Sequence, residues 1–103
     1  MPRPRKHRRC RRYDDDRVFK PRSIPMRDLP EVRLGLDELE AMRLCDLEGL
    51  EQEAAGVRMG VSRGTVQRLV KSGRAKVMRA LIDSSALIIE KGETDAVVHS
   101  DAG

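Results

Sequence analysis

Aromatic residues are almost missing from this chain of 103 residues: they make up 2% of it, and tryptophan does not occur. Domains rich in β-structure usually pack aromatic and β-branched side chains, so the composition favours helices joined through Leu, Val, Ile, Met and Ala. Long apolar runs are missing too, which leaves no candidate for a membrane span. A chain of this length has room for one small domain with tails.

Cysteine is also scarce. Cys10 and Cys45 are far apart in the sequence, so they do not form a disulfide framework, and a reducing compartment is the simpler expectation. The basic N-terminus is not followed by an apolar segment of the kind found in secretory signals. The sequence therefore predicts a cytoplasmic protein.

Acidic residues are missing from two long stretches, although the formal net charge is only +4. The first stretch is residues 1–12, which hold seven of the 21 basic residues. The second is Ala54–Ile82, which follows the acidic segment Asp37–Glu53. Its bases are Arg58, Arg63, Arg68, Lys71, Arg74, Lys76 and Arg79. Charge separated in this way along the sequence predicts charge separated in space and a polyanionic partner.

Three regions follow from composition. Residues 1–17 are charged and nearly free of apolar side chains, so we expect a disordered basic arm. Residues 18–90 form the domain, which begins with an extended strap because Pro21, Pro25 and Pro30 exclude a long helix. The short apolar run Ala86–Ile89 is either a strand or a packed tail. Residues 91–103 are expected to be a disordered tail.

A first helix is predicted over Glu38–Glu48. Asp37 is its expected N-cap, with Glu40 completing a capping-box pattern, and Gly49 suits the left-handed residue after its end. One apolar face is predicted, made of Leu36, Leu39, Leu47 and Leu50. Arg43 falls within that face, and a buried arginine needs a partner, so we expect an ion pair with Glu53.

Two further helices are predicted over Gln52–Met59 and Arg63–Ile82. Gly60 supplies the left-handed turn between them, Ser62 caps the longer helix, and Val61 with Val66 forms a hydrophobic staple. The buried stripe of the longer helix is predicted to be Val66, Leu69, Val70, Val77, Ala80 and Leu81. A short helix, a sharp turn and a longer basic helix are typical of an all-α, three-helix domain of the helix-turn-helix class.

The first turns of the longer helix carry donors suited to DNA bases. Those predicted to contact base edges are Ser62, Arg63, Gly64, Thr65, Gln67, Arg68 and Lys71, with Gly64 allowing close backbone approach. Those predicted to contact the sugar-phosphate backbone are Arg74, Lys76, Arg79, Arg3, Arg5, Lys6, Arg8 and Arg9. The alternative is a plain helical hairpin with a solvated basic face. The lack of any acid in Ala54–Ile82 favours duplex DNA, because an inert surface normally mixes signs.

Four segments resemble a family of small, largely uncharacterised prokaryotic proteins that begin with MPRPRK and are predicted to bind DNA. The segments are MPRPRK, FKPRSIPMRDLPEV, LDELEAMRLCDLEGL and RMGVSRGTVQRL, which together cover most of the chain up to Glu90. The segment GVSRGTVQRLVKSGRAKV is in addition similar to region four of sigma factors. This resemblance implies a helix that enters the major groove of a promoter-like duplex and a role in transcription regulation.

The same resemblance implies a metabolic context, since some family members are joined to, or lie beside, a domain related to iron-molybdenum cofactor assembly. Departures from the family pattern occur at His7, where Cys is frequent, and at Glu51, where a capping Ser is usual. Gly56 and Gly73 stand where Ala is usual. The resemblance therefore implies a less stable version of the domain, with the long helix loosened at Gly73.

Catalysis finds no support, because no Ser-His-Asp, Cys-His or paired-carboxylate set falls on predicted elements. His7 and Cys10 have a spacing that two metal ligands could share, but two ligands do not make a site, so no metal or cofactor is expected. Cys45 is read as a small packing residue. Two other functions stay open: an RNA-binding accessory protein that uses the arm, and a protein-interaction module that docks through the acidic first helix. Monomer and homodimer also both stay open.

Overall fold

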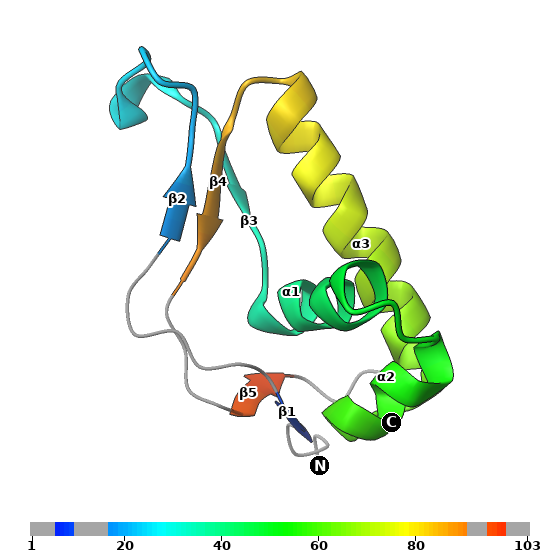
Figure 1. Ribbon diagram of the computed structural model, residues 1–103. Coiled ribbons are helices and arrows are strands. Elements are labelled where there is room, and N and C mark those ends of the chain that lie inside the picture. Colours follow the sequence, from blue (N-terminus) through cyan, green and yellow to red (C-terminus); the bar gives the residue numbers. More distant parts are fainter. Residues whose placement is uncertain (1–5, 10–16, 91–94, 99–103) are drawn as a thin grey trace.

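The computed structural model of the protein describes residues 6–9, 17–90 and 95–98, with side chains for 17–90. It is mainly helical, with a small sheet beside the helices (Figure 1). The helices are α1 (Leu36–Met42), α2 (Gln52–Met59) and α3 (Arg63–Ile82). The strands are β1 (Lys6–Arg9), β2 (Arg17–Phe19), β3 (Glu31–Arg33), β4 (Ala86–Ile89) and β5 (Asp95–Val98).

The expectation of an all-α domain is wrong in one respect, the three-stranded sheet of order β2-β4-β3. β4 pairs antiparallel with β2, placing Val18 opposite Ile88, and parallel with β3, placing Val32 opposite Leu87. The prolines of the strap limit it to two short extended segments, β2 and β3, separated by a 3-10 turn (η1, Met26–Asp28). The backbone N–H and C=O groups of these segments need hydrogen-bond partners. β4 supplies these partners on both of its edges, so Ala86–Ile89 is a strand and not a packed tail.

The arm and the tail also contain regular structure where the structure describes them. β1 and β5 pair antiparallel, with Lys6 opposite Val98 and Arg9 opposite Asp95. These two segments therefore differ from the disordered arm and tail that the sequence predicts. The remaining residues of both regions, Arg3, Arg5 and Cys10 among them, lie outside the described residues.

The helical core lies where α1 and α2 pack on the N-terminal half of α3, while the sheet lies beside the C-terminal half (Figure 1). Its fully buried members are Ala41, Leu44, Ala55, Met59, Val66 and Val70. Cys45 and Val61 are half-buried against this core, in agreement with the packing roles predicted for them. α3 runs unbroken past Gly73, where a Cβ would come within 2.5 Å of Met42 Sδ, so this glycine lets α1 approach closely.

The first helix departs most from its prediction. It starts two residues early: Gly35 is the N-cap, and its N–H donates to Glu38 Oε1 at 2.8 Å, so neither Asp37 nor Glu40 has its expected capping role. Regular helix ends at Met42 and continues as a π-helical turn (η2, Arg43–Leu47). That extra residue per turn rotates Leu47 out of the apolar face, and it is 80% exposed. Gly49 has the expected left-handed conformation, with φ +78°.

Arg43 does not pair with Glu53. Its guanidinium donates to both carboxylate oxygens of Glu40 at 2.8 Å and also to Glu48. Glu40, with Glu48 in a smaller part, raises the pKa of Arg43 above its ordinary value. The arginine is therefore neutralised within its own helical segment, because the three-residue spacing to Glu40 brings the two side chains onto one face.

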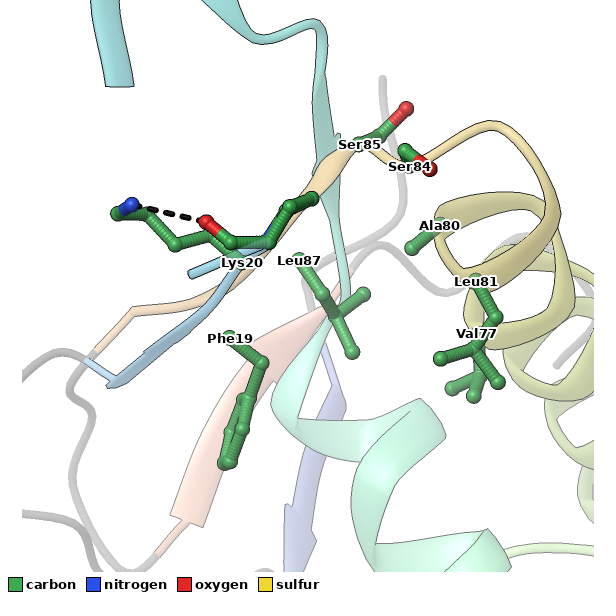
Figure 2. A pocket seen from close by; sticks show the side chains of 9 residues that line it. Phe19, Lys20, Val77, Ala80, Leu81, Ser84, Ser85 and Leu87 are labelled. Atoms are coloured by element: carbon green, nitrogen blue, oxygen red, sulfur yellow. Dashed lines mark hydrogen bonds between the residues drawn. The ribbon is translucent and has the colours of Figure 1, made fainter. Parts of the chain in front are cut away.

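An apolar hollow of about 270 Å³ separates the sheet from the end of α3 (Figure 2). Phe19 and Leu87 line it from the sheet, and Val77 and Leu81 from the helix. Leu81 was predicted to be buried but is 68% exposed on the open hollow, whereas Ala80 beside it is buried. Neighbouring Ile82 is exposed as well.

Candidate nucleic-acid interface

The turn between α2 and α3 has the geometry that the sequence predicts. α2 ends at Gly60, which has φ +73°, and the N–H of Val61 donates to the carbonyl of Gly56 at 2.9 Å. Ser62 is then the N-cap of α3, and its Oγ accepts the N–H of Thr65 at 3.2 Å. The first turn of α3 is therefore fixed by its own sequence before any partner is present.

Four of the predicted base-contacting residues share an exposed surface, which we call the readout surface: Arg63, Gln67, Arg68 and Lys71. Arg63, Gln67 and Lys71 follow one another at four-residue intervals, so they lie on one face of α3, with Arg68 beside them. Val66 and Val70 occupy the opposite face and are buried in the core. Core packing thus fixes which way the polar face of α3 points.

No carboxylate lies within ion-pair distance of these four side chains among the residues that the structure describes. Ser62 and Gly64 flank them and are accessible to solvent. On one side, Arg63 borders an open polar hollow whose wall includes Glu51 and Glu53. The edge of the readout surface at Arg63 is therefore mixed in sign, whereas the part around Arg68 and Lys71 is basic.

Thr65 does not belong to the readout surface. It is only 3% exposed, and its hydroxyl lies 3.0 Å from Ser62 Oγ and accepts Arg68 Nη2 at 3.2 Å. Sequence reasoning missed this because Thr65 follows Arg63 and Gly64 in a polar segment. The three-residue steps from Ser62 to Thr65 and from Thr65 to Arg68 are the signal that could have revealed it.

Two of the bases predicted to hold the DNA backbone are already paired with acids near α1. The Nε–H of Arg74 donates to Asp46 Oδ2 at 3.1 Å, and the hydrogen bonding from Arg74 lowers the pKa of Asp46. Lys76 Nζ donates to Glu38 Oε1 at 2.8 Å. The acidic and basic segments thus meet across the α1–α3 contact instead of separating in space as predicted. Asp46 and Glu38 are partners that the sequence did not reveal.

Arg79 is exposed and has no acidic partner within the described part of the chain. Lys6, Arg8 and Arg9 lie on β1, whose backbone pairs with β5 and which packs near α2. Their side chains, like Arg3 and Arg5, are outside the described residues. Contacts from these bases to a DNA backbone stay predictions.

Glu38 is a buried acid at the centre of the α1–α3 contact. Its carboxylate is 8% exposed and accepts hydrogen bonds from Lys76, from Ser72 Oγ at 2.5 Å and from the Gly35 N–H. Burial by itself raises the pKa of Glu38, but these hydrogen bonds outweigh it, so the pKa lies below its ordinary value of 4.5. Ionised Glu38 therefore stabilises the fold.

Replacing Glu38 with glutamine removes the charge that pairs with Lys76 and should lower the free energy of unfolding at neutral pH by about 1–2 kcal/mol. The loss is limited because Lys76 is partly exposed to solvent. Because the folded pKa is depressed, the stabilisation is present above pH 4.5 and disappears as the pH falls through the folded pKa. The difference between wild type and Glu38→Gln in urea unfolding should therefore shrink at lower pH. Glu53→Gln, at an exposed position, is the matched control, and a pH-independent difference for Glu38→Gln would contradict the assignment.

The described part of the chain also shows the state of its cysteine and bears on metal and membrane binding. Burial raises the pKa of the Cys45 thiol, which keeps it protonated and unreactive at neutral pH. No group of three or more His, Cys, Asp or Glu side chains is arranged to hold a metal ion among the described residues. Among the described helices, none combines the length and apolar character that crossing a bilayer requires.

Comparison with known proteins adds a family to this geometry. A family model described as "Protein of unknown function DUF134" matches residues 1–97. The chain belongs to this family. Its relatives include a UPF0251 protein of Halothermothrix orenii, 50% identical over 90% of this chain and 69% of its own length. Another, from Pelotomaculum thermopropionicum, is 50% identical over 96% of this chain and 75% of its own.

A relative from Rhodospirillum rubrum is 48% identical over 89% of this chain but over 64% of its own length, so part of that protein has no counterpart here. No solved structure matches the chain. The DUF134 comparison confirms the resemblance drawn from the sequence, a small and uncharacterised prokaryotic family. The names of these relatives imply no activity, so the functional proposal for this DUF134 member rests on its own side chains.

Proposed function

We propose that this protein binds double-stranded DNA through a helix-turn-helix formed by α2 and α3 and acts as a transcriptional regulator. The observation that carries the proposal is the readout surface, where Arg63, Gln67, Arg68 and Lys71 project together from the first turns of α3 and have no carboxylate within ion-pair distance among the described residues. The major groove is about 12 Å wide and admits one α-helix. Arg and Lys pair with guanine and Gln with adenine, which gives sequence preference.

The turn supports this mode of binding. α2 crosses α3 closely because Ala55 and Gly56 are small and buried, so α2 can lie over the DNA backbone while α3 enters the groove. The free N–H groups at the start of α3, with Ser62, favour a phosphate there. Arg74 is exposed in its pair with Asp46, and a surface ion pair is worth about 0–1 kcal/mol, so a phosphate can compete for it.

The protein-interaction alternative loses its main support. Its docking charge would come from the acids around α1, yet Glu38, Glu40, Asp46 and Glu48 are already paired with Lys76, Arg43 and Arg74. These four carboxylates are thus already engaged within the domain, which weakens their attraction for a basic partner. The RNA alternative depends on the arm, and competition between duplex DNA and bulk RNA separates it from base readout.

Arg68→Ala is the direct test. After bound sequences are selected from random duplex DNA, fluorescence anisotropy should show that Arg68→Ala weakens binding to the selected duplex by roughly 5- to 150-fold and relaxes preference at one base pair. Arg27→Ala, which removes the same charge from the exposed η1 turn, should change little.

Deleting residues 1–12 should instead weaken binding to every sequence and flatten the salt dependence, since those residues would contact phosphates. Equal losses on all sequences from Arg68→Ala and from this deletion would contradict base readout. Bulk RNA that competes as well as the selected duplex would favour the RNA-binding function.

A further inference from the structure

Thr65 occupies an unusual place for a polar residue in the first turn of an exposed helix. It is buried at 3% exposure, and its N–H and hydroxyl both point to Ser62 Oγ, at 3.2 and 3.0 Å. The two hydroxyls are within hydrogen-bond distance of each other, and either can be the donor, so the backbone and the side chain of Thr65 both contact the N-cap.

Arg68 is the third member of this chain of hydrogen bonds. Its Nη2 donates to Thr65 Oγ1 at 3.2 Å, and its Nη1 lies 3.8 Å from the place that a Cβ would take on Gly64. The guanidinium is therefore turned back along α3, over the glycine, towards the N-terminus of the helix. One of its five N–H donors is used, and the others remain available on the exposed side chain.

This arrangement has an energetic consequence for recognition. A free arginine side chain loses rotamer entropy when a partner immobilises it, and that loss weakens binding. Arg68 is already held before binding, whereas the side chains of Arg63, Gln67 and Lys71 have no hydrogen-bond partner among the described residues. Arg68 should accordingly give the sharpest base preference of the four.

We propose that Thr65 is a positioning residue: its hydroxyl, fixed by Ser62, holds the Arg68 guanidinium in the orientation that reads a base. This inference rests on the proposed function, since it presumes that Arg68 meets DNA. It assigns Thr65 no contact of its own with DNA. Under this proposal, Ser62, Thr65 and Arg68 act together through their hydrogen bonds, and the three-residue spacing places their side chains within reach of one another.

The test compares Thr65→Val, which keeps the shape but removes the hydroxyl, with Thr65→Ser, which keeps the hydroxyl. Binding is measured on the selected duplex and on duplexes changed at one base pair. Thr65→Val should weaken binding to the selected duplex by about 3- to 10-fold and flatten preference at the position that Arg68→Ala also relaxes. Thr65→Ser should keep the affinity and the base preference of wild type. Neither variant should change binding to unrelated duplex.

Two further measurements keep the outcomes distinct. The double variant Thr65→Val with Arg68→Ala should bind no more weakly than Arg68→Ala alone, and urea unfolding shows that each variant is folded at the assay temperature. Additive losses, or a Thr65→Val protein that keeps full preference at that position, would overturn the positioning role while leaving DNA binding intact. A wild-type protein without sequence preference would instead overturn the proposed function, and the positioning role with it.

Discussion

Leu44→Ala should lower the free energy of unfolding by about 2–5 kcal/mol, measured by urea or thermal unfolding. Leu44 is 1% exposed and lies in the core with Ala41, Met59 and Val66. Truncation removes buried apolar surface and leaves a cavity, because the surrounding helices cannot collapse completely into the space. Small domains have about 5–15 kcal/mol of stability, so the loss should shift the midpoint strongly.

Leu47→Ala is the matched control, because the same chemical change is made in the same π-helical turn. Leu47 is 80% exposed, so its truncation should change stability by less than about 0.5 kcal/mol. The sequence pattern places both leucines in helix and predicts that Leu47 is buried, hence a substantial loss there. Similar losses from Leu44→Ala and Leu47→Ala would show that the π-helical turn is not formed.

Gly56→Val should also be strongly destabilising, by about 3 kcal/mol. A Cβ on Gly56 would come within 2.7 Å of the Val61 carbonyl oxygen and 3.4 Å of the Ser62 carbonyl carbon. Both atoms belong to the backbone of the turn, so they cannot move aside as a flexible side chain can. The β-branched side chain forces α2 away from the start of α3, and unfolding midpoints in urea should fall accordingly.

Ala54→Val serves as the control, since Ala54 lies on the exposed face of the same helix. It introduces the same side chain into the same helix without contact to the turn, and its helix-propensity cost relative to Ala is less than about 1 kcal/mol. Gly56→Val carries no such cost, because Val is a better helix former than Gly, so a larger loss there reports the clash with the turn. If Gly56→Val were no more destabilising than Ala54→Val, the close contact between α2 and the turn would be disproved. In that case, the folded Gly56→Val protein, assayed without urea, would be expected to bind DNA as wild type does.

Local signals predicted the α2–α3 region well. The bounds of both helices, the left-handed Gly60 and the Ser62 cap agree with the structure because each depends on residues a few positions apart. A cap accepts an N–H from its own helix, and a left-handed turn needs a residue that tolerates positive φ. The exposure of Arg63, Gln67, Arg68 and Lys71 follows from the apolar stripe opposite them.

Predictions that depended on long-range contacts were less successful. Glu38 was expected to begin a helix and lies at its N3 position, where its buried carboxylate accepts from Ser72 and Lys76, more than thirty residues away in the sequence. The sequence predicts an ion pair of Arg43 with Glu53 in the next helix, but Arg43 pairs with Glu40 in its own helical segment. The sheet escaped prediction because β4 has to meet β2 and β3 from distant parts of the chain.

By itself, the sequence determined where α2 and α3 begin and end, the turn between them, and the basic character of the exposed face. These features follow from interactions within a few residues, whose geometry the backbone sets directly. Tertiary structure alone decided that Arg74 and Lys76 meet acids near α1 and that the carboxylate of Glu38 is buried at the α1–α3 contact. Those outcomes depend on how α1 packs against α3, and packing is a property of side-chain shapes meeting across the fold.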